Sequence, residues 1–280
     1  MASHSKSSLA RQPRSAASSK SLQKAIRILL HLGENGPDMS LTQFASALRL
    51  NKTTVHRLLR ALQKFHLIER NPHSEKYRLG LKFHALGARS VLWRSLPYDA
   101  RPFLVELSRR SGETAILAIP GTGGIICLDS VNLSAALLTV RFLPGDFIPA
   151  HCTAFGRAIL SWLPDPEVRA ILRRWGMYRY TPNTCDNPRD LRYALEVHRR
   201  QGYAVEHGEV ESGLVSIAAP ILYRGNRIVA SIGVSGPKDR FTLVHARMKT
   251  DLVKKFAAKL SKLFSRGPAD FATISPPYVS

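Results

Sequence analysis

Residues 40–79 constrain the fold more than any other part of the chain, because two short amphipathic helices and a hairpin follow one another there. Ser40 and Gln43 stand three residues apart, which is the spacing of a capping box at a helix start. Apolar residues then recur at helical spacing, namely Leu41, Phe44, Ala45 and Leu48. Arg49 and Leu50 form a turn, and Asn51 suits the cap of a second helix. The pattern predicts a helix-turn-helix.

The second predicted helix has one apolar face and one polar face. Its apolar face holds Val55, Leu58, Leu59 and Leu62, and its polar face holds Lys52, Thr53, His56, Arg57, Arg60 and Lys64. A helix whose solvated face is cationic or hydroxylic suits the major groove of DNA, where phosphates flank readable base edges. Residues 67–70 and 77–79 follow as two strands joined by the turn-rich residues 71–74. These features predict a winged helix-turn-helix that binds DNA; the alternative is a small helical core with a solvated basic side.

The residues predicted to contact DNA are chosen by their positions on the second helix and on the hairpin. Five residues on its first two turns are predicted to reach base edges and nearby phosphates: Lys52, Thr53, Thr54, His56 and Arg57. Arg57 suits bidentate recognition of guanine, a contact that contributes roughly 1–3 kcal/mol of discrimination. The predicted phosphate or minor-groove contacts of the hairpin are Arg70, His73, Lys76 and Arg78. For each residue alone, the alternative is an ordinary solvated surface.

Charge is distributed unevenly along the chain. Residues 1–90 hold 16 Lys and Arg against 4 Asp and Glu, whereas residues 91–280 hold 25 against 16, for a total net charge of +21. A positive field of this size steers a protein toward polyanions and makes binding fall with salt. Nucleic acid is therefore the expected macromolecular partner, ahead of an anionic membrane surface.

Several features predict a cytoplasmic protein without a metal site. No stretch of about 18 apolar residues suggests a membrane span, and residues 1–20 lack the apolar core of a secretory signal. Those residues lack Asp and Glu, as transit peptides do, but a disordered basic arm explains their order better. The three cysteines are Cys127, Cys152 and Cys185. Their odd number and wide spacing favour a reducing compartment, and the absence of a C-x-x-C pair argues against structural zinc; no cofactor is indicated.

The length of 280 residues suggests about two domains. We expect a disordered basic tail over 1–20, the DNA-binding domain over 21–80, a linker and dimerisation helix over 81–97 that Pro97 ends, a second domain over 98–265 and a flexible tail over 266–280. The first helix is expected to pack through Leu22, Ala25, Ile26, Leu29 and Leu30. In the second domain we expect strands at 115–119, 125–130, 137–142, 203–205, 215–222 and 228–234, and helices at 102–110, 153–163, 165–175, 189–202 and 241–264. Their order predicts an α/β (α+β) domain with a central antiparallel sheet flanked by helices.

At this point the chain resembles the IclR family of bacterial transcriptional regulators from about Ser21 to Phe264. The blocks that carry the resemblance are 21–25, 52–59, 77–80, 100–102, 149–158, 180–184, 200–205 and 218–220. The resemblance implies a C-terminal GAF-like effector-binding domain behind the winged helix-turn-helix. It also implies dimers or dimer pairs that repress or activate catabolic genes.

Two departures from the family concern backbone geometry. Members usually have Gly where this chain has Arg49, and Gly again near His66. A positive φ at a non-Gly residue costs roughly 1–2 kcal/mol. Either these two residues bear that strain or the turns shift slightly.

A candidate effector site lies where residues 146–152 run into a helix that begins near Thr153. A helix N-terminus offers free N–H groups to a carboxylate, and the resemblance implies that a small organic acid binds here. The matching positions are Ile148, Ala154, Phe155, Glu206, Leu214, Ser216 and Ser235. Some relatives have Cys at Ser216, Ser at Gly233 and a smaller residue at Phe155, so the ligand of a relative does not transfer directly. The alternative is that the serines satisfy strand ends and that Glu206 pairs with an arginine.

The expected function is that of a sequence-specific DNA-binding regulator whose affinity or activity a small metabolite modulates. A rival is a metabolite-binding or thiol-dependent enzyme module tethered to DNA, because His151 precedes Cys152 and a base-activated thiolate is a nucleophile. Sequence neighbours usually point apart and no third orienting group is evident, so no catalytic residue is predicted. A nonspecific nucleic-acid binder is a third reading, distinguished by salt dependence without sequence preference.

Overall fold

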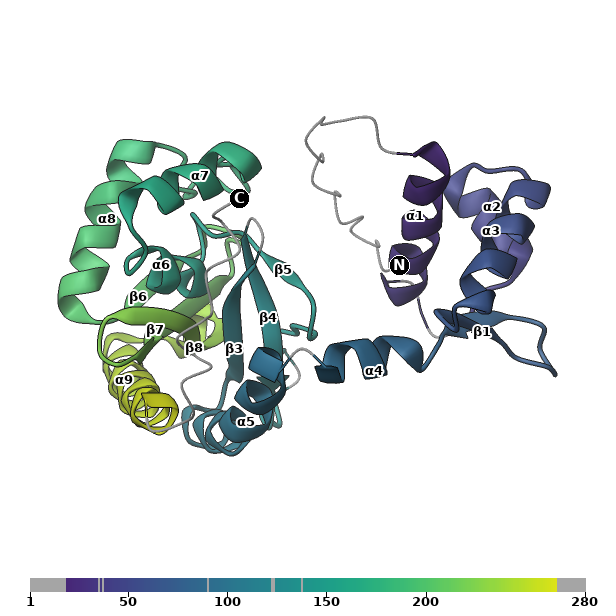
Figure 1. Cartoon of the computed structure of the whole chain (residues 1–280). Coiled ribbons are helices and arrows are strands. Elements are labelled where there is room, and N and C mark those ends of the chain that lie inside the picture. The colour runs from purple at the N-terminus through teal and green to yellow at the C-terminus, as the bar shows by residue number, and fades with distance from the viewer. Residues whose placement is uncertain are drawn as a thin grey trace. The chain divides into compact units, whose positions relative to one another are not determined.

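The computed structural model describes residues 19–265 except 35, 37, 90, 122, 123 and 137 (Figure 1). It divides into two compact units between Arg94 and Ser95, and each unit is described by itself. The predictions for residues 1–18 and 266–280 lie outside the described residues. Lys20, predicted in the tail, is the first residue of a helix. No helix in the described part of the chain is long and apolar enough to cross a membrane.

The first unit is a winged helix-turn-helix. Its elements are α1 (Lys20–Glu34), α2 (Leu41–Leu48), α3 (Lys52–Lys64), β1 (Ile68–Arg70), β2 (Tyr77–Leu79) and α4 (Lys82–Arg89). The capping box at α2 is formed: the Gln43 amide donates to Ser40 Oγ at 3.3 Å, and the Ser40 amide donates to Gln43 Oε1 at 2.8 Å. At α3, Asn51 Oδ1 accepts from the Thr54 amide at 2.8 Å. The two caps satisfy N–H groups that a helix start otherwise leaves unpaired.

The core of this unit joins α1, α2 and α3 to the hairpin. Its buried residues are Ile28, Leu32, Met39, Phe44, Leu48, Val55, Leu58, Leu59, Leu62, Ile68 and Tyr77. The packing expected for α1 was partly wrong, because Leu22, Ile26 and Leu30 are about half exposed. The helix has more apolar surface than one face can bury against α2 and α3, so the core takes the side centred on Ile28 and leaves the other stripe uncovered.

Arg49 and His66 adopt the strained backbone conformation for which related proteins use glycine. Their φ angles are 52° and 58°, in the left-handed region. Arg49 ends α2 there, and its amide still donates to the Ser46 carbonyl at 3.2 Å. His66 cannot move aside easily, because its carbonyl lies against Gly80, where a Cβ would come within 2.2 Å of it. The turns therefore keep their geometry and accept the strain.

The second unit is an α+β domain built on one antiparallel sheet. Its elements are α5 (Val91–Ser111), β3 (Thr114–Gly121), β4 (Gly124–Val131), β5 (Phe147–Ile148), α6 (Ala154–Leu160), α7 (Asp165–Trp175), α8 (Pro188–Gln201), β6 (Ala204–His207), β7 (Leu214–Tyr223), β8 (Arg227–Pro237), the 3-10 turn η1 (Lys238–Arg240) and α9 (Leu243–Ser265). The strand order is β5-β4-β3-β8-β7-β6, with every neighbouring pair antiparallel.

Helices cover both faces of this sheet (Figure 1). On one face, α6 packs on the strands beneath α7 and α8, and its Phe155, Ala158 and Ile159 join a single buried cluster with Ile116 and Ala218 of the strands. On the other face α9 lies along β7 and β8, and Phe103 of α5 meets Phe256 of α9 edge-on with ring centroids 6.3 Å apart.

Two sequence-based predictions in this unit were wrong. Pro97 does not end a helix but lies inside α5, together with Pro102. Each proline removes one helical N–H donor, yet α5 continues through both positions. Residues 138–142 form no strand: side chains replace the sheet ladder, since Thr114 Oγ1 donates to the Val140 carbonyl at 2.6 Å and Ser130 Oγ donates to the Phe142 carbonyl. Residue 137 lies outside the described part.

Candidate DNA interface and effector site

The solvated face of α3 presents cations and hydroxyls without any acidic side chain. Val55, Leu58, Leu59 and Leu62 are buried and fix the helix in the first unit. Of the residues predicted to contact DNA, Lys52, Thr53, His56 and Arg57 are exposed and Thr54 is half-buried. Arg60 and Lys64 extend the exposed basic face by two further turns. The geometry suits a helix inserted into a groove with phosphates on both sides.

Two of the predicted contacts on the wing are held by acidic neighbours. Arg70 Nη2 lies 2.9 Å from Glu75 Oε1, and its guanidinium lies over the Tyr77 ring at 5.9 Å. Arg78 Nη2 lies 3.1 Å from Glu69 Oε2. These are exposed pairs of small net strength, so a phosphate can compete for either arginine. Lys76 forms no ion pair with any described residue and is exposed, as is His73.

Glu69 has a second contact that sequence reasoning missed. While Oε2 pairs with Arg78, Oε1 accepts from the Leu81 amide at 3.3 Å, one residue before α4. One carboxylate therefore joins the wing to the start of α4. The cross-strand pairing of Glu69 with Arg78 follows from the hairpin register, but the contact with Leu81 needed the tertiary structure.

In the second unit, three of the predicted ligand residues form a row across neighbouring strands. Glu206 of β6 pairs in register with Ser216 of β7, which pairs with Ser235 of β8. The hydroxyls of the two serines lie 2.9 Å apart. Thr114 of β3 continues the row beside Ser235. Adjacent residues on a sheet project to the same face, so these polar groups line one strip of the face that α6 covers.

Glu206 is a buried carboxyl in an unusual environment. It is 3% exposed, and its Oε1 accepts from the Glu209 amide at 2.6 Å. Burial raises the pKa of Glu206 to about 7, against the lowering effect of its bonds to the Glu209 amide and the Ser216 hydroxyl. The carboxyl can therefore be protonated near neutrality and act as a donor as well as an acceptor.

The start of α6 supplies the second half of the predicted site. Thr153 Oγ1 caps the helix by accepting from the Gly156 amide at 3.0 Å. The amides of Ala154 and Phe155 belong to the first turn, whose N–H groups have no acceptor within the helix. The Phe155 carbonyl is held by Ser231 Oγ at 3.1 Å, and Ile148 packs in the same core.

The predicted ligand residues are enclosed. Ile148, Ala154, Phe155, Glu206, Ser216 and Ser235 are buried, and only Leu214 is half-buried. The structure thus gathers the polar row beneath α6, whereas the Phe155 side chain lies within the apolar core.

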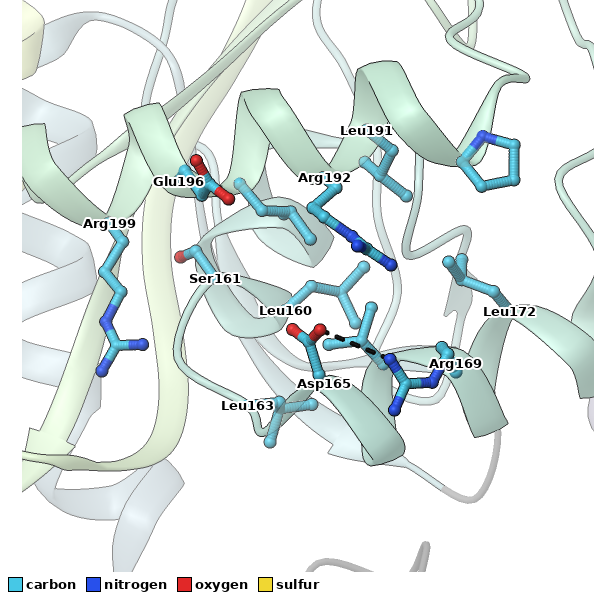
Figure 2. A pocket seen from close by; sticks show the side chains of 13 residues that line it. Leu160, Ser161, Leu163, Asp165, Arg169, Leu172, Leu191, Arg192, Glu196 and Arg199 are labelled. Carbon is cyan, nitrogen blue, oxygen red and sulfur yellow. Dashed lines mark hydrogen bonds and ion pairs between the residues drawn. The ribbon is translucent and has the colours of Figure 1, made fainter.

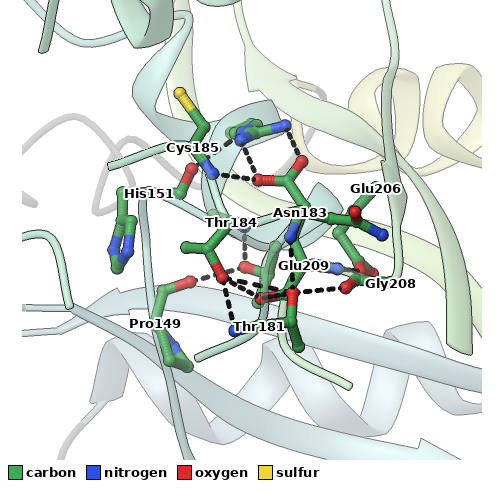
Figure 3. A network of polar contacts seen from close by, with 12 residues as sticks. Pro149, His151, Thr181, Asn183, Thr184, Cys185, Glu206, Gly208 and Glu209 are labelled. Atoms are coloured by element: carbon green, nitrogen blue, oxygen red, sulfur yellow. Dashed lines mark hydrogen bonds and ion pairs between the residues drawn. The ribbon is translucent and has the colours of Figure 1, made fainter. Parts of the chain in front are cut away.

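Sequence reasoning missed an ion pair made by Glu209, the residue whose amide binds Glu206 of this row (Figure 3). Arg157 of α6 forms a bidentate pair with Glu209, with both N–O distances at 2.5 Å. Their side chains are only 6% and 11% exposed. The residues stand 52 positions apart, so no local spacing pattern signals the contact.

The environment of Cys152 argues against the thiol-enzyme reading. Cys152 is fully buried, and burial raises the pKa of its thiol to about 12, with the charge of Glu209 as the next cause. An activated thiol needs a lowered pKa. His151 Nε2 instead contacts the Tyr178 carbonyl at 2.9 Å. Across the described residues, no group of three or more His, Cys, Asp or Glu side chains is arranged to hold a metal ion.

A separate pocket of about 130 Å³ lies between α6, α7 and α8 (Figure 2). Its floor is apolar, with Leu160, Leu163, Leu172 and Leu191 among its walls, and an exposed pair of Asp165 and Arg169 lies at its edge. None of the seven predicted ligand residues lines it. It is therefore distinct from the row centred on Glu206.

Two family models match the chain. The model described as the bacterial transcriptional regulator IclR C-terminal matches residues 93–262, and the model described as the IclR helix-turn-helix domain matches residues 21–72. Together they span both structural units.

Individual proteins show the same similarity. The HTH-type transcriptional regulator XynR of Escherichia coli (strain K12) is 33% identical over 217 residues, which is 77% of this chain and 85% of XynR. The crystal structure of an IclR transcriptional regulator from Alicyclobacillus acidocaldarius has a TM-score of 0.73 at 27% identity, covering 89% of this chain and 100% of that chain. An IclR homologue from Microbacterium hydrocarbonoxydans, crystallised with 4-hydroxybenzoate, shares the fold with a TM-score of 0.75 at 21% identity, over 89% of this chain and 100% of that one.

Proposed function

Since the chain belongs to the IclR family of bacterial transcriptional regulators, with a helix-turn-helix DNA-binding domain followed by a ligand-binding domain, we propose that it acts as a dimer on a palindromic operator. We further propose that a small organic acid, bound at the row of Glu206, Ser216 and Ser235, changes its affinity for that operator.

The observation that carries the DNA-binding proposal is the exposed face of α3. It carries Lys52, Arg57, Arg60 and Lys64 and no acidic residue, and a capped N-terminus presents Lys52, Thr53 and Arg57 on the first two turns. Arg57 is the proposed base reader, and Lys76 of the wing is the proposed phosphate contact. Each phosphate contact contributes a salt-sensitive term that carries no sequence preference.

Exposed apolar side chains on and beside α4 support the dimer. Leu81, Phe83 and Leu86 are 79%, 37% and 50% exposed. Apolar side chains grouped in this way on a soluble protein commonly mark a protein contact. We expect sedimentation at micromolar concentration to give a dimer or larger species, and Leu86→Glu to weaken association. A wild-type monomer under these conditions would contradict the dimer proposal.

Selection of bound duplexes from a random DNA pool tests specificity, at about 150 mM salt with excess nonspecific competitor. We expect a palindrome to be enriched. Arg57→Ala should relax preference at one base pair of each half-site, at a cost of about 1–3 kcal/mol per contact. Arg192→Ala, which removes the same charge from the second unit, is the control. Recovery of random sequences by the wild type would mean that the basic face only grips phosphate.

The effector proposal rests on the polar row and the amide-rich start of α6, beside a carboxyl that can donate or accept a proton. The test is a panel of small aliphatic and aromatic acids, 4-hydroxybenzoate among them, added to the complex with the selected operator. We expect one class to shift operator affinity, and Ser216→Ala to weaken that response without changing operator binding in its absence. A panel without effect on the wild type would contradict this part of the proposal.

A further inference from the structure

The proposed effector site is buried, so an effector needs an opening in the segments that cover it. Glu206, Ser216 and Ser235 are 3%, 6% and 1% exposed. Two loops reach this site through Glu206. Residues 208–213 connect β6 to β7, and the Glu209 amide binds Glu206. Residues 177–187 follow the Gly176 cap of α7, lead to α8, and contact Gly208 through Thr181. What holds these loops down therefore determines access to the site.

Glu209 is the centre of the contacts that hold the loops (Figure 3). Its amide donates to Glu206 Oε1, and its carboxylate accepts from the Cys185 amide at 2.9 Å. Its carbonyl accepts from Thr184 Oγ1 at 2.5 Å, and Thr181 Oγ1 donates to the neighbouring Gly208 carbonyl at 2.7 Å. The 177–187 loop is thus tied to Gly208 and Glu209 of the 208–213 loop, and Glu209 is tied to the polar row.

Arg157 joins this arrangement to α6. Two of its nitrogens bind the Glu209 carboxylate, and Nε donates to the His151 carbonyl at 2.7 Å. His151 in turn contacts the Tyr178 carbonyl. The start of α6 and the Glu206 row, which are the two halves of the proposed site, are therefore held together through Arg157 and Glu209.

We infer that Arg157 and Glu209 form a latch, a pair of positioning residues that keeps the two halves of the effector site in register, and that release of the 177–187 loop at this latch admits the effector. The inference rests on the proposed function only in identifying the enclosed space as an effector site. Neither residue needs to touch the ligand.

Two buried thiols allow latch opening to be measured separately from unfolding. Cys152 is fully buried and directly follows His151. The charges of Glu209 and Arg157 both act on the pKa of its thiol, so it lies close to the latch. Cys127 is equally buried, but it lies on β4. Of these two fully buried thiols, opening of the latch exposes Cys152 and leaves Cys127 covered, whereas global unfolding exposes both; Cys185 lies in the 177–187 loop, is already half-buried, and is not used as a reporter. Alkylation by iodoacetamide, followed for each cysteine by mass spectrometry, therefore reports local opening directly.

The decisive variant is Arg157→Met combined with Glu209→Met. Replacing a buried ion pair by apolar side chains often leaves stability unchanged, whereas removing one partner leaves an unpaired charge. In the double variant the Cys185 amide and the His151 carbonyl lose their charged partners. We expect alkylation of Cys152 to accelerate by about tenfold or more, since hydrogen bonds to charged groups contribute at least that factor, while Cys127 stays at its wild-type rate.

Thr184→Val keeps the test valid if the double variant does not fold. It removes one hydroxyl that donates to the Glu209 carbonyl and accepts from the Tyr180 and Thr181 amides of the same loop, and it leaves the ion pair intact. Thr250→Val is the matched control, because Thr250 Oγ1 donates only within α9, to the Ala246 carbonyl. We expect Thr184→Val to accelerate Cys152 severalfold and Thr250→Val to leave it unchanged. Wild-type rates at Cys152 in Thr184→Val, or in a folded double variant, would overturn the latch.

The alkylation experiment uses the whole chain without DNA or effector, so it stands apart from the proposed function. If no acid of the panel shifts operator binding by the wild type, the proposed function fails while the latch result remains readable. If the wild type responds to an acid, the folded latch variants should need a higher concentration of it. An unchanged response in a variant with fast Cys152 alkylation would overturn the link between latch and site.

Discussion

Replacing Gly156 with alanine would test how closely α6 is seated on the loop before it. A Cβ at this position would lie 2.3 Å from the Ala150 carbonyl oxygen and 2.5 Å from its Cα, both backbone atoms. Neither side can withdraw easily. The Phe155 carbonyl is held by Ser231 Oγ, and Thr153 Oγ1 donates to the Pro149 carbonyl at 2.7 Å.

The expected cost follows from this crowding. Overpacking against atoms that cannot move lowers the free energy of unfolding by about 1–3 kcal/mol. This is the net loss after the roughly 0.5–1 kcal/mol that alanine gains over glycine in a helix. For a unit of this size, each kcal/mol lowers the melting temperature by about 2–4 °C. We therefore expect Gly156→Ala to melt about 2–12 °C below the wild type, measured by intrinsic tryptophan fluorescence.

Gly213→Ala provides the matched control. Nothing lies within 4 Å of a Cβ built there, and the φ angle of Gly213 is not in the left-handed region. Such a substitution is neutral or stabilises by up to about 1 kcal/mol through the unfolded chain. The reasoning would be refuted if Gly156→Ala melted within about 1 °C of the wild type. It would also be refuted if Gly213→Ala melted at or below the melting temperature of Gly156→Ala.

Three further predictions follow from individual contacts. Asn51→Ala removes the cap of α3 and should lower the stability of the DNA-binding unit by about 1 kcal/mol; an unchanged urea midpoint would contradict it. Glu69→Gln releases Arg78 and removes a negative charge from the wing, so operator affinity at low salt should rise by about two- to fivefold; equal or weaker binding in a titration would count against this. The pKa of Glu206 is raised by burial, so its stabilising contribution is present below its unfolded pKa and lost as pH rises through about 7. The melting temperature of Glu206→Gln minus that of the wild type should therefore increase from about pH 5 to pH 8. The pKa of His198, lowered to about 4 by burial, acts in the opposite direction but equally in both proteins, and a flat difference would contradict the prediction for Glu206.

The helix-turn-helix could be predicted from the sequence because its signals are local. A cap, the four-residue spacing of a helical stripe and a turn are interactions between near neighbours, and Ser40, Asn51 and the buried face of α3 fulfil them. The long strands β7 and β8 were predictable for the same reason. Local patterns also identified the α3 face as basic, although they did not show that Arg70 and Arg78 pair with acidic residues of the wing.

Only the tertiary structure showed where the secondary structure differs from the one that the local sequence favours. Pro97 lies within α5 despite its missing donor, and residues 138–142 give their carbonyls to side chains rather than to a strand. The left-handed geometry of Arg49 is likewise held by its surroundings.

The same holds for the effector domain. The resemblance named Glu206 as a candidate ligand residue, but its burial and raised pKa depend on strands and loops far apart in the chain. The contact between Arg157 and Glu209 depends on them too, because two charges separated by 52 residues meet only after the sheet has formed. Local spacing determined most helices and strands of this protein, whereas desolvation and long-range contact, which no local pattern encodes, brought the residues of the candidate site together.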